Sequence, residues 1–218
     1  MSPNFGAVAQ QLGERVRKGR PHTEDVLTAI GRLANVGDRL ASRARELDGD
    51  RDLTVTGRAN ALASTVTKGL VKDFAQASER PRKALSHLNA QKAGMSLPPM
   101  EKGDVVEMMR RMEIRAHVAS LLLDKRVAAM LDPDMRVAVF DAPASLSGIP
   151  AEHFNQAKTA FIREIHGEKF AEIEGALEDY AAASAVATMV KNELAGASGL
   201  SRGAFDTLVH GFEQETDK

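Results

Sequence analysis

The apolar residues between Val26 and Leu47 recur at alternating steps of four and three positions. This heptad spacing is typical of a helix that packs along another helix, because it returns apolar side chains to one face. A similar pattern resumes at Ala59, after the polar turn LDGDRD at 47–52. Two long helices joined by a short turn fold back on each other, so a long antiparallel hairpin is predicted. Its first seam comprises Val26, Ile30, Leu33, Gly37, Leu40, Ala44 and Leu47.

Composition extends the helical prediction to the whole chain. Aromatic residues make up only 4% of the 218 residues, tryptophan is absent, and good helix formers dominate. We therefore expect an all-α fold, in which the hairpin is followed by a helical bundle. The segment RVAVF at 136–140 is ambiguous, since it fits a short helix or a single strand. The predicted helices cover 5–18, 23–47, 59–80, 81–92, a run from Val105, a long helix after Pro150 with a kink at Gly167, and 201–214.

A change in the sign of the net charge and a pair of prolines mark a boundary in the chain near residue 94. Residues 1–93 hold 16 Lys and Arg against 10 Asp and Glu, a net charge of +6, whereas the remainder has a net charge of −7. Pro98 and Pro99 cannot continue a helix. The expected organisation is a basic helical hairpin region at 1–93, a Pro-containing linker at 94–103 and an acidic helical bundle region at 104–218.

The helix after the linker has an apolar stripe, and the sequence does not state directly which surface this stripe faces. It could face the protein's own core, a partner helix or a chemical site. We predict that it faces the core, that Asp104 caps the helix, and that Glu107 and Arg111 pair on its outer face. The stripe comprises Val105, Met109, Met112, Ala116, Ala119 and Leu123.

Common catalytic and metal-binding patterns are missing from the sequence. The absence of cysteine excludes thiolate nucleophiles and Cys-ligated metal sites. No Glu-x-x-His pair, phosphate-binding glycine loop or nucleophile elbow is present. We expect a non-enzymatic protein with no metal or cofactor. A helical enzyme with a site outside these motifs remains an alternative.

Basic residues gather at both ends of the first region. They could contact nucleic-acid phosphates, whose binding needs only such charges, but no aromatic platform lies among them. Pairing with an acidic surface, in another copy or another protein, is an equally good interpretation. The residues are Arg15, Arg17, Lys18 and Arg20 near the start, and Arg80, Arg82 and Lys83 near the end.

Methionines concentrate around the linker. Methionine fills irregular gaps in cores and also suits adaptable binding surfaces. Core packing is the simpler interpretation, and a docking surface formed by Met95, Met100 and Met108 is the alternative. No signal-peptide core and no run of eighteen apolar residues is present, so we expect a non-secreted protein without a membrane partner.

The segments MEIRAH at 112–117 and VFDAPASLSGIP at 139–150 resemble uncharacterised helical proteins of tailed bacteriophages and prophages. The resemblance covers about residues 105–150 and carries no catalytic motif. It implies a phage-encoded protein in the bacterial cytoplasm or the phage particle, from the neighbourhood of virion genes. The expected function is that of a structural or assembly protein, a minor virion or virion-assembly component, that forms homo-oligomers or binds virion proteins. A nucleic-acid-binding regulator is the alternative.

Overall fold

The computed structural model describes the backbone of residues 4–16, 18–97, 100–101 and 103–216. Within these ranges every regular element is a helix, which confirms the all-α prediction. The elements are α1 Phe5–Gly13, α2 Thr23–Gly49, α3 Val55–Thr65, the π-helical turn η1 Val66–Leu70, α4 Val71–Gly94, α5 Val105–Ser120, α6 Leu123–Ala129, α7 Pro133–Phe140, the 3₁₀ turn η2 Ala144–Leu146, α8 Ala151–Ala197 and α9 Arg202–Thr216.

The chain divides into two compact units. Unit 1 comprises Met1–Asn89 and Glu174–Lys218, and unit 2 comprises Ala90–Ile173. Helices α4 and α8 each contribute residues to both units. This grouping differs from the predicted division at 94–103, because the C-terminal helices join the N-terminal hairpin.

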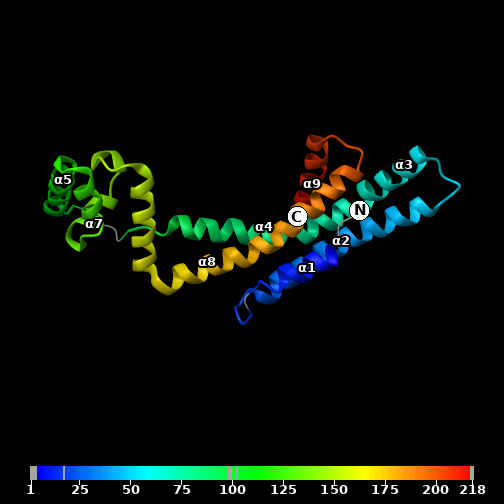
Figure 1. Cartoon of the computed structure of the whole chain (residues 1–218), viewed down its shortest axis with the longest axis horizontal. Coiled ribbons are helices and arrows are strands. Elements are labelled where there is room, and N and C mark those ends of the chain that lie inside the picture. The colour runs from blue at the N-terminus through cyan, green and yellow to red at the C-terminus, as the bar shows by residue number, and fades with distance from the viewer. Residues whose placement is uncertain (1–3, 17, 98–99, 102, 217–218) are drawn as a thin grey trace. The chain divides into compact units, whose positions relative to one another are not determined.

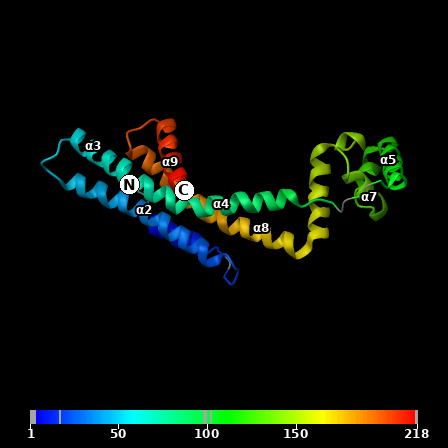
Figure 2. The ribbon, with the colours of Figure 1, turned by 180° about the vertical axis from the view of Figure 1, so that it is seen from behind.

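The hairpin of unit 1 pairs α2 with the helix that runs from α3 through η1 into α4. The two arms lie side by side and antiparallel, joined by the loop at 50–54 (Figure 1 and Figure 2). The C-terminal part of α8 and helix α9 complete its core, which shows why the hairpin needs few large side chains of its own. The fully buried members of this core include Val26, Leu33, Val66, Val71, Ala183, Val186, Val190, Leu194 and Phe205.

Helix α1 is held on α2 by a contact between Phe5 and Gly37. Phe5 is buried, and a Cβ atom at Gly37 would lie only 2.5 Å from Cγ of its ring. Glycine in the predicted seam therefore makes room for an aromatic ring. The helix ends at Gly13, so the prediction that it continues to Lys18 is wrong.

The second arm of the hairpin is longer than predicted, because it continues through Pro81 to Gly94. Proline removes one helical hydrogen bond, at a cost of about 3 kcal/mol in a helix interior. Pro81 is itself buried, and the burial of Phe74 and Ala77 on the same helix offsets this cost. About three turns before Pro81, η1 inserts an extra residue into the helix, and Leu70 rather than Gly69 enters the core.

Unit 2 packs α5, α6, α7 and the N-terminal part of α8 around three phenylalanines. The ring centroid of Phe140 lies 5.4 Å from that of Phe154 and 5.6 Å from that of Phe161. The ambiguous segment at 136–140 belongs to a helix, α7. Asp132 caps it by accepting a hydrogen bond from the backbone of Asp134 over 2.8 Å.

Helix α8 contains the predicted kink at Gly167. This residue has φ of 43° and ψ of −117°, a conformation that side chains other than glycine rarely adopt. The 47-residue helix is therefore two helical segments joined at one glycine.

Candidate functional site

Helix α5 of unit 2 turns its apolar stripe outward. Val105, Val106, Met108, Met109 and Met112 are all exposed, from 43% for Met108 to 79% for Val106. The prediction that the stripe faces the core is therefore wrong. We call Val105, Val106, Met108, Met109, Met112 and the exposed Ala116 the α5 apolar face.

The inner side of α5 is the more polar one. Arg111 is only 9% exposed, and Val118 is fully buried. The guanidinium group of Arg111 donates hydrogen bonds to Glu107 over 2.8 Å and to Asp141 over 3.0 Å. Glu107 and Arg111 therefore pair as predicted, but Arg111 lies on the buried side of the helix.

These arginine contacts decide which way α5 faces. Arg115 donates from Nη1 to the carbonyl oxygen of Ala138 over 3.0 Å, and Arg111 reaches Asp141 at the C-cap of α7. The C-terminal end of a helix carries partial negative charge, so both cations are favourably placed there. Turning the stripe inward would remove these contacts and would bring the exposed Glu113 toward the core.

The ion pair between Glu107 and Arg111 shifts the pKa values of both groups so that each keeps its charge. The hydrogen bond from Arg111, with a second from Arg110, holds the pKa of Glu107 below its usual range. The same bond to Glu107, together with Asp141, raises the pKa of Arg111. Both groups are therefore charged at neutral pH.

The α5 apolar face is comparable in area to the largest apolar patch of a typical monomer. Its side chains expose on the order of 500 Å², and the largest apolar patch of a typical monomer, about 300–600 Å², is itself often functional. Methionine supplies half of its residues and adapts readily to a partner's shape.

The three methionines of the predicted docking surface do not share one environment. Met95 is buried, Met100 is half-buried and Met108 is exposed. Only Met108 belongs to the α5 apolar face. Spacing places Met109 and Met112 on one face of a helix but does not give the direction of that face, so the prediction that they face the core is wrong.

Four of the predicted basic contact residues are paired with carboxylates of their own unit. Arg20 pairs with Asp179 over 3.0 Å and Arg80 with Asp25 over 3.0 Å. The exposed Arg15 and Lys18 have no ion pair with the residues that the structure describes, and Arg17 lies outside those residues. The remaining two pairs are Lys83 with Glu79 over 2.7 Å and Arg82 with Glu213 over 3.3 Å.

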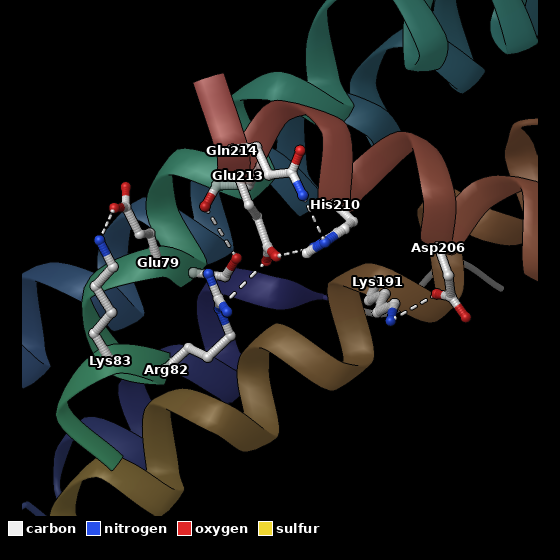
Figure 3. A network of polar contacts seen from close by, with 10 residues as sticks. Glu79, Arg82, Lys83, Lys191, Asp206, His210, Glu213 and Gln214 are labelled. Carbon is white, nitrogen blue, oxygen red and sulfur yellow. Dashed lines mark hydrogen bonds and ion pairs between the residues drawn. The ribbon is translucent and has the colours of Figure 1, made fainter. Parts of the chain in front are cut away.

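Figure 3 shows how such pairs connect α4, α8 and α9. Arg82 of α4 reaches Glu213 of α9, while Lys191 of α8 reaches Asp206 of α9 over 2.7 Å. Lys191 lowers the pKa of Asp206 through this bond. The pairs border an apolar cavity of about 230 Å³ whose lining includes Phe74. These ion pairs hold α9 against α4 and α8 within unit 1.

The separation of charge along the sequence disappears within the units. Unit 1 contains 18 Lys and Arg and 18 Asp and Glu, and unit 2 contains 11 and 12. The acidic C-terminal segment neutralises the basic hairpin because both belong to unit 1. Opposite charge therefore stabilises the chain internally and no longer favours pairing between oppositely charged halves.

No group of three or more His, Asp or Glu side chains suited to a metal ion occurs among the described residues. None of the helices in the described ranges has the length and apolarity that a bilayer crossing requires. No protein-family model, curated protein or solved structure matches the chain.

Proposed function

We propose that this chain is a non-enzymatic structural or assembly protein that acts through helix-mediated protein–protein contacts. The observation that carries the proposal is the α5 apolar face, which Arg111 and Arg115 hold toward solvent. Keeping large apolar side chains in water is unfavourable, at roughly 25 cal/mol per Å² relative to burial. A partner that covers the face recovers this free energy.

The setting that we propose is a bacteriophage particle or its assembly. The resemblance to phage proteins spans about residues 105–150, and α5 lies within this segment. The segment that resembles phage proteins therefore carries the exposed face. In this proposal the protein works in the bacterial cytoplasm during assembly or within the particle.

The size of the native protein in an extract of its source cells tests the proposal. We expect the native chain to sediment in a complex well above its own 23.5 kDa. The variant Met109→Lys/Met112→Lys should leave that complex, whereas Leu131→Lys, at an exposed leucine of unit 2 outside α5, should remain in it. A native chain found only at its own mass would contradict the proposal.

Nucleic-acid binding remains the second candidate, because Arg15 and Lys18 are exposed without an ion pair in the described part of the chain. Two such cations give a weak, salt-sensitive site. Fluorescence anisotropy with single- and double-stranded DNA and RNA at low salt tests it, with Arg15→Gln/Lys18→Gln as the control. No binding by the native chain would eliminate this candidate.

A further inference from the structure

The apolar face of α5 is suited to pairing with a copy of itself. We propose that two copies of this chain associate through the α5 apolar face, with the two α5 helices antiparallel. This inference rests on the proposed function and names the partner as a second copy. Three properties of the face support it: its spacing, the charges on its edge and its area.

Spacing makes the face self-complementary. Val105, Met109, Met112 and Ala116 follow one another at steps of four, three and four, and all are exposed. In an antiparallel pair, Met109 of each copy can face Met112 of the other, and Val105 can then face Ala116. A two-fold interface needs such reciprocal contacts, in which residue i meets j and j meets i. The pairs also combine large with small side chains at both ends.

The charged edge of the face fits the same register. Arg110, which also donates to Glu107 of its own helix over 3.2 Å, and Glu113 are both exposed and lie on one side of the stripe. When Met109 faces Met112, Arg110 of one copy is displaced from Glu113 of the other by about 3 Å along the helix axis, within reach of an arginine side chain. The two-fold axis produces this pair twice. In a parallel two-fold pair the charged edges of the two copies would lie on opposite sides of the interface, so Arg110 of one copy would not meet Glu113 of the other.

The area of the α5 apolar face and the fixed orientation of α5 agree with a dimer of modest affinity. Two faces of on the order of 500 Å² each would bury about 1,000 Å², the lower limit for a specific interface. Because Arg111 and Arg115 already hold the opposite side of α5, the face is presented without rearrangement. Little backbone freedom is then lost on association, and we expect micromolar dissociation constants.

Sedimentation equilibrium of the purified full-length chain measures this directly. The native chain should move from monomer to dimer as its concentration rises through the micromolar range. Met109→Lys/Met112→Lys should weaken dimerisation on the order of 100-fold, because these central positions would bring four cations together. Both methionines are exposed, so the fold should survive, and circular dichroism and the melting temperature check this. Leu131→Lys should dimerise like the native chain.

A charge exchange tests the antiparallel register. Arg110→Glu and Glu113→Arg should each weaken the dimer on the order of tenfold, because each variant places like charges together in both pairs. A mixture of the two variants should form heterodimers with native affinity, since both cross-pairs become attractive. The double variant Arg110→Glu/Glu113→Arg should likewise recover native affinity. Loss of affinity in the mixture would contradict the register.

Failure of this inference differs from failure of the proposed function. A purified chain that stays monomeric at all concentrations would overturn self-pairing, whether the face is free or covered by another part of the same chain. If the native complex in cell extracts is nevertheless lost with Met109→Lys/Met112→Lys, the partner is another protein and the proposed function stands. If the native chain is monomeric in both experiments, both proposals are wrong.

Discussion

Arg20 donates a hydrogen bond from Nη1 to Oδ2 of Asp179 over 3.0 Å, although 159 positions separate the two residues. Nε2 of His22 lies 2.8 Å from the same oxygen, and the His22 ring stacks on Tyr180 with centroids 5.7 Å apart. The guanidinium group of Arg20 occupies the space where a Cβ atom of Gly175 would lie. These contacts join the segment before α2 to α8 within unit 1.

Asp179→Asn should therefore destabilise unit 1. The carboxylate is only 4% exposed, and its replacement removes a charge-assisted contact to Arg20, at a cost of about 1–3 kcal/mol. Gly175→Ala should have a similar effect, because its methyl group would displace Arg20. Thermal unfolding followed by circular dichroism measures both. Asp48→Asn, at an exposed carboxylate of α2, should change stability by less than about 0.5 kcal/mol. Equal melting temperatures for the Asp179 and Asp48 variants would show that the contact does not stabilise the unit.

Gly37→Ala should release α1 from α2. The added methyl group would overlap the ring of Phe5, and such overpacking costs about 1–3 kcal/mol. Gly31→Ala is the matched control on the same helix, because no atom lies within 4 Å of its added Cβ. It should stabilise α2 by up to about 1 kcal/mol through helix propensity. Urea unfolding of both variants measures the difference, and changes of the same sign would contradict the contact between Phe5 and Gly37.

Gly167→Ala should strain α8 at its kink. With φ of 43° and ψ of −117°, an alanine side chain would meet its own backbone, at a cost of about 1–3 kcal/mol. Gly211→Ala in α9 has ordinary helical geometry and open space, so its stability should stay equal or rise slightly. Thermal melts compare the two variants. A native melting temperature for Gly167→Ala would mean that the chain passes through this residue in another conformation.

Acid should loosen α5. Because the pKa of Glu107 is lowered in the folded chain, its contribution to stability is complete above the usual glutamate pKa of about 4.3 and is lost as pH falls through the lowered value. NMR spectra of the α5 amides, recorded from about pH 6 to pH 3, should show this transition. Glu107→Gln should remove it, whereas Glu113→Gln, at an exposed glutamate of the same helix, should retain it. A transition that persists in Glu107→Gln belongs to another carboxyl group.

Local features of the fold follow from the sequence alone. The heptad spacing from Val26 predicts the hairpin, Asp104 caps α5 by accepting from the backbone of Glu107 over 2.9 Å, and Gly167 marks the kink. Each depends on residues close together in the chain, whose periodicity, side-chain oxygen or missing Cβ acts over one or two helical turns. The helical class and these positions could therefore be predicted.

Tertiary structure alone decides which side of α5 faces water and which segment balances the basic hairpin. The periodicity of α5 shows that an apolar stripe exists, but its direction depends on contacts from Arg111 and Arg115 to α7, more than twenty positions away. The partners of Arg20 and Arg82 lie farther still along the chain, at Asp179 and Glu213. Spacing describes one helix at a time, whereas burial and ion pairing are properties of two surfaces that meet only after the chain has folded.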